Sequence, residues 1–206
     1  MQLQNVISPM DATVAYMKKK KFLETLQLGW IENNEDSQME RDVLERLQPH
    51  ENLKRLTIRN YGGTRFPHWF GDDSLSNVVS LELRNCKYCL SLPPLGQLSS
   101  LKELTVSGLG GVMAVGVDFY GNNSSSAVQP FKSLEILNLG NMAAWEEWCC
   151  FEGQNEGGAF PHLRVLNINN CPKLKGATAA RSSLFKKLSD RGLPAARVFN
   201  SQFSIY

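Results

Sequence analysis

Five cysteines carry the most reactive side chains of this 206-residue chain. Cys86 and Cys89 have the Cys-x-x-Cys spacing of half a zinc site, and Cys149, Cys150 and Cys171 supply the remaining thiols. A structural zinc site takes four converging ligands, normally as two spaced pairs. The chain has only one such pair, so we expect no metal. We interpret Cys86 and Cys171 as residues that pack and form hydrogen bonds in turns.

Acid–base chemistry would fall to the histidines and to one pair of adjacent glutamates. Glu146 and Glu147 stand between Trp145 and Trp148. Adjacent side chains in a strand or turn diverge, and we interpret the tryptophans as loop anchors. The histidines all lie beside prolines in connecting segments; they are His50, His68 and His162. No serine or cysteine has a nucleophile motif around it. The sequence therefore predicts no enzyme and no cofactor.

Charge and composition exclude further functions. The 22 basic and 20 acidic residues leave a net charge of +2, too balanced to imply a nucleic-acid or acidic-membrane partner. The lysine run Lys18 to Lys21 is interpreted as the solvated end of a helix over residues 11–22 rather than as a nuclear-import or phosphate-binding patch. The longest apolar stretch, 108–117, is half as long as a membrane span. The odd number of cysteines and the absence of a secretory signal predict a cytoplasmic protein.

The elements that would position these side chains follow from a repeated apolar pattern. An apolar residue is followed by a second three residues on and by a third two residues later, and six such copies begin 23 to 33 residues apart. The copies are Leu23, Leu26, Leu28; Leu53, Leu56, Ile58; Val78, Leu81, Leu83; Leu101, Leu104, Val106; Leu134, Leu137, Leu139; and Leu163, Leu166, Ile168. This period is typical of a leucine-rich-repeat solenoid, whose units cover each other's apolar faces.

Apolar and polar residues alternate around each copy, which predicts a short strand with one buried and one open face. We therefore expect an α/β leucine-rich-repeat solenoid, or horseshoe, with a parallel concave sheet of about six short strands and irregular convex loops. Segments such as 66–69 and 160–163, and the polar runs 121–126 and 152–158, fit the irregular return paths. Three regions result. Residues 1–22 form an opening segment that contains the helix, residues 23–176 form the repeat domain, and residues 177–206 form a divergent tail, interpreted as a poor cap or a disordered end.

The open face of the predicted sheet is where a partner would bind. Charged residues concentrate on its second to fourth strands, and arginine and tryptophan are the residue types most enriched at interface anchors. The candidate partner-binding residues are Trp30, Arg55, Arg59, Glu82, Arg84, Glu103, Asn138 and Asn167. The alternative interpretation is a solvated face with no partner.

Several phrases outside the ladder are similar to those of one family. They are 44–56 (LERLQPHENLKRL), 61–69 (YGGTRFPHW), 92–101 (LPPLGQLSSL), 116–121 (GVDFYG), 145–148 (WEEW) and 171–174 (CPKL). Over about residues 3–176 the chain resembles the leucine-rich-repeat region of plant coiled-coil, nucleotide-binding, leucine-rich-repeat disease resistance proteins. The resemblance implies a protein partner in the defence response, namely a pathogen effector, a guarded host protein or a receptor's nucleotide-binding domain.

One departure from this family bears on function. The sequence contains no Gly-x-x-x-x-Gly-Lys-Ser/Thr loop, so the nucleotide switch of such receptors is not part of this chain. We therefore keep a second hypothesis, in which the chain is a truncated, regulatory or inactive fragment of the repeat region.

Overall fold

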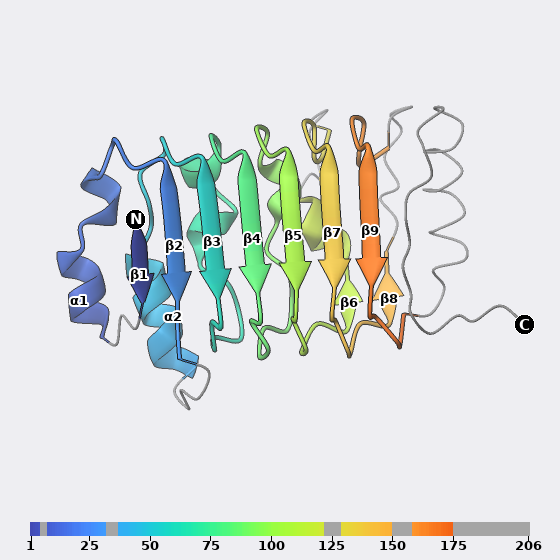
Figure 1. Ribbon diagram of the computed structural model, residues 1–206, viewed down its shortest axis with the longest axis horizontal. Coiled ribbons are helices and arrows are strands. Elements are labelled where there is room, and N and C mark those ends of the chain that lie inside the picture. Colours follow the sequence, from blue (N-terminus) through green and yellow to red (C-terminus); the bar gives the residue numbers. More distant parts are fainter. Residues whose placement is uncertain (5–7, 32–36, 122–128, 150–157, 175–206) are drawn as a thin grey trace, which may run out of the picture.

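A computed structural model describes residues 1–4, 8–31, 37–121, 129–149 and 158–174 of the chain (Figure 1). The polar runs predicted over 121–126 and 152–158 lie almost wholly outside these residues, and the tail predicted over 177–206 lies outside them entirely.

The main element is a parallel sheet of seven short strands in the order β1-β2-β3-β4-β5-β7-β9. Their bounds are β1 Gln2–Gln4, β2 Thr25–Gly29, β3 Arg55–Arg59, β4 Ser80–Arg84, β5 Glu103–Ser107, β7 Ile136–Gly140 and β9 Val165–Asn169. All six strands predicted from the apolar pattern are present, and the expected fold class is confirmed. The addition is β1, which pairs with β2 so that Gln2 faces Gln27.

The apolar residues of the six copies form continuous ladders inside the solenoid. Strand pairing aligns one ladder in the middle of the sheet; its members are Leu26, Leu56, Leu81, Leu104, Leu137 and Leu166. Each of these leucines is at most 1% exposed. Burying such a side chain stabilises the fold by roughly 1.5 to 3 kcal/mol. Because each leucine is covered mainly by the coils on either side, the repeats stabilise one another.

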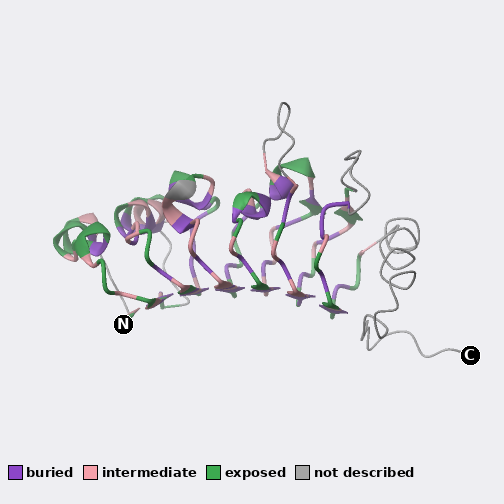
Figure 2. Ribbon diagram, turned by 90° about the horizontal axis from the view of Figure 1, so that it is seen from above, coloured by how far each residue is buried: buried purple, intermediate pink, exposed green. Residues whose placement is uncertain are grey.

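Short helical segments line the side of the sheet opposite to the open face (Figure 2). They are α1 Pro9–Val14, η1 Met17–Lys19, α2 Ser37–Arg46, η2 His68–Phe70, η3 Asp73–Leu75, η4 Leu95–Gln97 and η5 Val117–Tyr120. A second small sheet pairs β6 Ala114–Val115 with β8 Glu147–Trp148. Seen end-on in Figure 2, the strands of the main sheet follow a shallow arc whose concave side faces away from the helices.

The helix predicted over 11–22 has other bounds, so that prediction is wrong in its limits. The helix α1 begins at Pro9, where the Ser8 hydroxyl caps it by accepting a hydrogen bond from the Asp11 backbone N–H at 3.2 Å. It ends at Val14 because Tyr16 adopts a left-handed conformation with φ of 45°. This turn buries Met17 in the core, where helical continuation would not have placed it. Lys18 to Lys21 then lie at and after the η1 turn, largely exposed.

The helix α2 was not predicted, although its residues carry a helical signal. Val43, Leu44 and Leu47 are fully buried at helical spacing and pack under the first repeats. The Leu44 carbonyl accepts a hydrogen bond from the Trp69 indole at 3.2 Å, which ties α2 to the η2 turn. The pattern was missed because the stronger leucine ladder begins again at Leu53.

Candidate functional site

The concave face is formed by the polar residues that alternate with the buried leucines. Pairing places them in rows across the strands, so that Arg55, Ser80 and Glu103 share one row. The next row carries Thr57, Glu82, Thr105, Asn138 and Asn167, and the last carries Arg59, Arg84, Ser107, Gly140 and Asn169. The structure thus brings together seven of the eight candidate residues on one continuous surface.

The eighth candidate, Trp30, is not on this surface, and its predicted placement is wrong. Its side chain is only 7% exposed, and its ring centroid lies 5.3 Å from that of Tyr61. Trp30 directly follows the last residue of β2, where alternation no longer fixes the side-chain direction. A large aromatic ring gains most by entering the core there. Its indole Nε1 is buried and has no hydrogen-bond partner within the part of the chain that the structure describes.

The equivalent position after the later strands is held by residues that tolerate a left-handed backbone. It carries Asn60, Asn85, Gly108, Asn141 and Asn170, all with φ between 47° and 74°. Asparagine and glycine adopt this conformation at the lowest cost. The amides also bond between coils, since Asn60 Nδ2 donates to the Trp30 carbonyl at 3.2 Å and Asn170 Nδ2 to Asn141 Oδ1 at 2.7 Å. This row fixes the edge of the concave face.

Charge on the concave face centres on Glu82. Its carboxylate lies 3.6 Å from the Arg59 guanidinium and also forms an ion pair with the Nε of Arg84. The Thr57 hydroxyl donates a hydrogen bond to the same carboxylate at 3.3 Å. Because the two arginine side chains remain 54% and 47% exposed, their guanidinium groups stay open to solvent and to a partner.

The far half of the face is neutral and lined by amides. Asn167 Nδ2 donates to Asn138 Oδ1 at 2.6 Å, and Asn138 Nδ2 donates to the Thr105 hydroxyl at 3.1 Å. This chain of bonds orients three half-buried side chains across β5, β7 and β9. Each amide is therefore held in place before any partner arrives, which lowers the entropy cost of binding.

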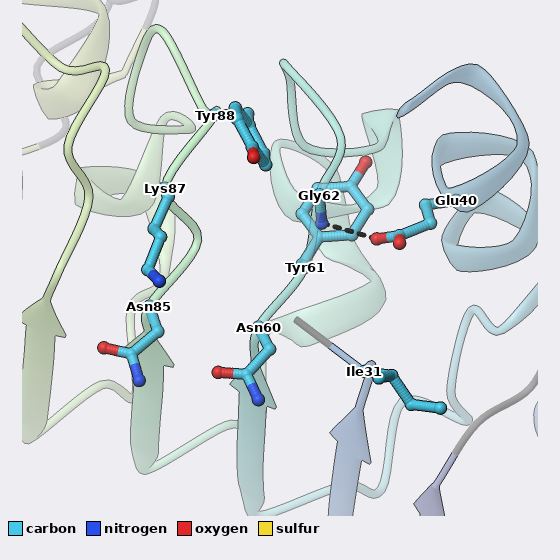
Figure 3. Close-up of a pocket in the computed structure, with 8 residues that line it drawn as sticks. All are labelled: Ile31, Glu40, Asn60, Tyr61, Gly62, Asn85, Lys87 and Tyr88. Atoms are coloured by element: carbon cyan, nitrogen blue, oxygen red, sulfur yellow. Dashed lines mark hydrogen bonds between the residues drawn. The ribbon is translucent and has the colours of Figure 1, made fainter. Parts of the chain in front are cut away.

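A shallow pocket borders the concave face beyond the ends of β2 to β4 (Figure 3). Its lining residues are Ile31, Glu40, Asn60, Tyr61, Gly62, Asn85, Lys87 and Tyr88. The buried carboxylate of Glu40, on α2, accepts a hydrogen bond from the Gly62 backbone N–H at 2.5 Å. Ile31 and Tyr88 are 63% and 57% exposed and add apolar surface at the rim. Sequence reasoning missed this pocket, because no spacing in the sequence signals that α2 reaches Gly62.

Cys86 and Cys171 occupy the packing positions that the sequence predicted. Cys86 and Cys171 are buried, and their thiols donate to the carbonyls of Arg84 at 3.5 Å and Asn169 at 3.2 Å. Cys89 donates to the Gly63 carbonyl at 3.1 Å, and a hydrogen bond with Cys86 together with burial raises the pKa of its thiol. Burial likewise raises the pKa of the Cys171 thiol. Cys86, Cys89 and Cys171 are all buried, which suits a packing role.

The tryptophans of the Trp145 to Trp148 segment anchor a loop, as predicted. Trp145 is fully buried, and its indole donates to the Glu147 carbonyl at 2.8 Å. The Trp148 indole donates to the Tyr120 hydroxyl at 2.9 Å. The Glu146 carboxylate lies 3.9 Å from the Lys173 ammonium group.

Within the described residues, no group of three or more histidine, cysteine, aspartate or glutamate side chains is arranged to hold a metal ion. His68 and His162 are exposed in the connecting segments, away from the concave face. Among the same residues, no helix has the length and apolar character that crossing a bilayer requires.

Comparison with known proteins agrees with this geometry. Residues 1–109 match the sequence family described as R13L1/DRL21 LRRs. A candidate disease resistance protein of Arabidopsis thaliana, RPP13-like protein 1, is 40% identical over 187 residues, which cover 85% of this chain and 18% of that protein. The disease resistance protein RGA2 of Solanum bulbocastanum is 30% identical over 180 residues, covering 84% of this chain and 18% of that protein.

A third relative covers nearly the whole chain. The candidate disease resistance protein RGA4 of Solanum bulbocastanum is 33% identical over 202 residues, which are 97% of this chain and 20% of that protein. The chain therefore spans a fifth or less of the length of these three curated relatives. No solved structure matches it.

Proposed function

The chain belongs to the R13L1/DRL21 family of leucine-rich repeats, and from this we propose that it is a protein-binding module that recognises a pathogen-derived or host protein in the defence response. Its relation to disease resistance proteins confirms the resemblance found in the sequence. The observation that carries the proposal is the concave face, where seven candidate residues form one ordered polar surface on a stacked sheet.

The surface has the features of a recognition face. A parallel sheet with buried leucine ladders on one side holds its outward side chains at fixed spacing, so that a partner meets a preformed pattern. Arginine is among the residues that contribute most at interfaces, and Arg55, Arg59 and Arg84 are all exposed here. The oriented amides of Asn138 and Asn167 add donors and acceptors beside them.

Binding without catalysis, and a cytoplasmic location, are parts of the same proposal. Support for binding comes from the titratable side chains of the concave face, which are arginines and glutamates engaged with one another or with solvent. Support for the cytoplasm comes from Cys86, Cys89 and Cys171, which are free thiols in the folded chain. Free thiols persist in a reducing compartment.

A second candidate function is regulation. In it, the concave face binds the nucleotide-binding domain of a disease resistance receptor rather than a pathogen-derived or host target. The exposed arginines of the face, which suit a protein partner of either kind, support this alternative.

Affinity purification of the tagged full chain from infected and uninfected plant tissue, followed by mass spectrometry, tests both candidates. The test variant is R59E/R84E on the concave face, and the matched control is K18E/K132E, which reverses two exposed lysines outside the sheet. We expect partners to be retained by the control and lost by the concave variant, with unchanged circular dichroism for both. A pathogen or host target supports recognition, and a receptor nucleotide-binding domain supports regulation. If the concave variant retains every partner, the concave face is not the binding site.

A further inference from the structure

We propose that the partner segment seated on the concave face is acidic where it covers β3 and β4 and basic where it covers β5. This inference rests on the proposed function and specifies the chemistry of the partner. It follows from charges on the face that the fold itself leaves uncompensated.

The first uncompensated charge is positive and belongs to the pair Arg59 and Arg84, which share Glu82. Arg59 and Arg84 are direct partners across β3 and β4, and like charges in that arrangement repel each other. Both guanidinium groups pair with the single Glu82 carboxylate. One carboxylate neutralises one of the two cations, so this cluster carries a surplus positive charge that remains about half exposed. An arriving carboxylate would complete it.

The second uncompensated charge is Arg55, which shares the open face of β3 with Arg59. Its neighbours in the same row are Thr25 on β2 and Ser80 on β4, and neither is charged. Arg55 is exposed, and no described carboxylate pairs with it. A guanidinium group binds a carboxylate through two parallel hydrogen bonds, which makes an acidic side chain the best-matched group for this position.

The third charge has the opposite sign and fixes the direction of the partner. Glu103 occupies the same row as Arg55, two strands further on, with Ser80 between them. Strand spacing places the two positions about 10 Å apart, and among the described residues the two side chains form no ion pair with each other. Glu103 is exposed, and its neighbour on the other side is the uncharged Ile136. A basic side chain of the partner would therefore neutralise it. Beyond it the face is neutral, with Asn138 and Asn167.

A segment of another protein fits this pattern better than a second copy of the chain does. Two copies could in principle pair Arg55 of each with Glu103 of the other. However, the sheet curves so that its charged face is concave, and two concave faces meet only at their rims (Figure 2). A convex loop or helix reaches the floor of the face, where these side chains lie.

Selection of displayed random peptides on the full chain tests this charge order. The wild-type chain and the charge-swapped variant R55E/E103R are used in parallel as targets. We expect wild-type binders to carry Asp or Glu toward one end and Lys or Arg toward the other, and we expect the swapped variant to select the reverse order. Individual peptides selected on the wild-type chain should bind R55E/E103R about tenfold more weakly than the wild-type chain. Their affinity for the wild-type chain should fall as the salt concentration is raised. The control variant K18E/K132E should bind them unchanged.

Three results would overturn the inference. The first is that both targets select the same charge order, and the second is that charged peptides are not enriched over neutral ones. The third is that sedimentation velocity shows a dimer that R55E dissociates and R55E/E103R restores, since the charges would then serve self-association. In the second case, neutral peptides that no longer bind the N167R variant would contradict this inference and leave the proposed function in place. The proposed function itself fails only if R59E/R84E retains every tissue partner.

Discussion

Replacing Leu104 by alanine should destabilise the whole solenoid, because this side chain belongs to the ladder that joins the coils. Leu104 is fully buried on β5, between Leu81 of β4 and Leu137 of β7. A buried Leu→Ala change costs about 2 to 5 kcal/mol, since the cavity adds to the lost transfer free energy. Because the change loosens the contacts on both sides of β5, we expect about 3 kcal/mol.

Equilibrium urea unfolding, followed by circular dichroism and tryptophan fluorescence, measures this cost. With an m value of about 2 kcal/mol per molar urea, the unfolding midpoint should fall by about 1.5 M. The matched control is Glu103→Ala, one residue earlier and exposed on the concave face, which should change stability by at most about 0.5 kcal/mol. If the Leu104→Ala midpoint moves no further than that of the control, the shared leucine ladder does not hold the fold together.

Two further predictions concern close packing and alkaline pH. Gly96→Ala should lower the free energy of unfolding by about 1 to 3 kcal/mol, because a Cβ there would lie against the Tyr120 carbonyl oxygen. The control is Gly116→Ala, which should be near neutral because a Cβ there meets nothing within 4 Å. Thermal melts measure both variants, and equal melting temperatures would contradict the packing. Burial raises the pKa of Tyr61 above its usual 10.0, so its contribution to stability is complete below pH 10 and is lost as the pH rises further. Tyr61→Phe should therefore lower the urea midpoint at pH 7, by removing the 2.8 Å hydrogen bond to the Arg65 carbonyl, and flatten its fall above pH 10; an unchanged alkaline slope would refute this.

The strands were predictable because their signal is local. In a copy such as Leu101, Leu104 and Val106, alternation over a few residues fixes both the strand and its buried face, and recurrence fixes the parallel pairing. The packing positions of Cys86 and Cys171 were predictable for the same reason, since they follow their strands in a repeated register.

Other features depend on contacts between distant segments and were missed or misplaced. The left-handed turn at Tyr16 ends α1 early, and Met17 after it is buried in the core. The lysine run that follows does not indicate this turn. The carboxylate of Glu40 reaches Gly62 only because α2 packs against the first coils, which leaves the rim pocket without a sequence signature.

The repeat period, the strand positions and the chemical identity of the concave side chains can be predicted from the sequence, because they follow from the pattern within each repeat and from its recurrence along the chain. Contacts between coils determine that Trp30 turns into the core and that Arg59 and Arg84 share Glu82, while Arg55 and Glu103 remain unpaired with each other. Those outcomes depend on which side chains of neighbouring coils come within reach, and the free energy of such contacts is settled only after the coils have stacked.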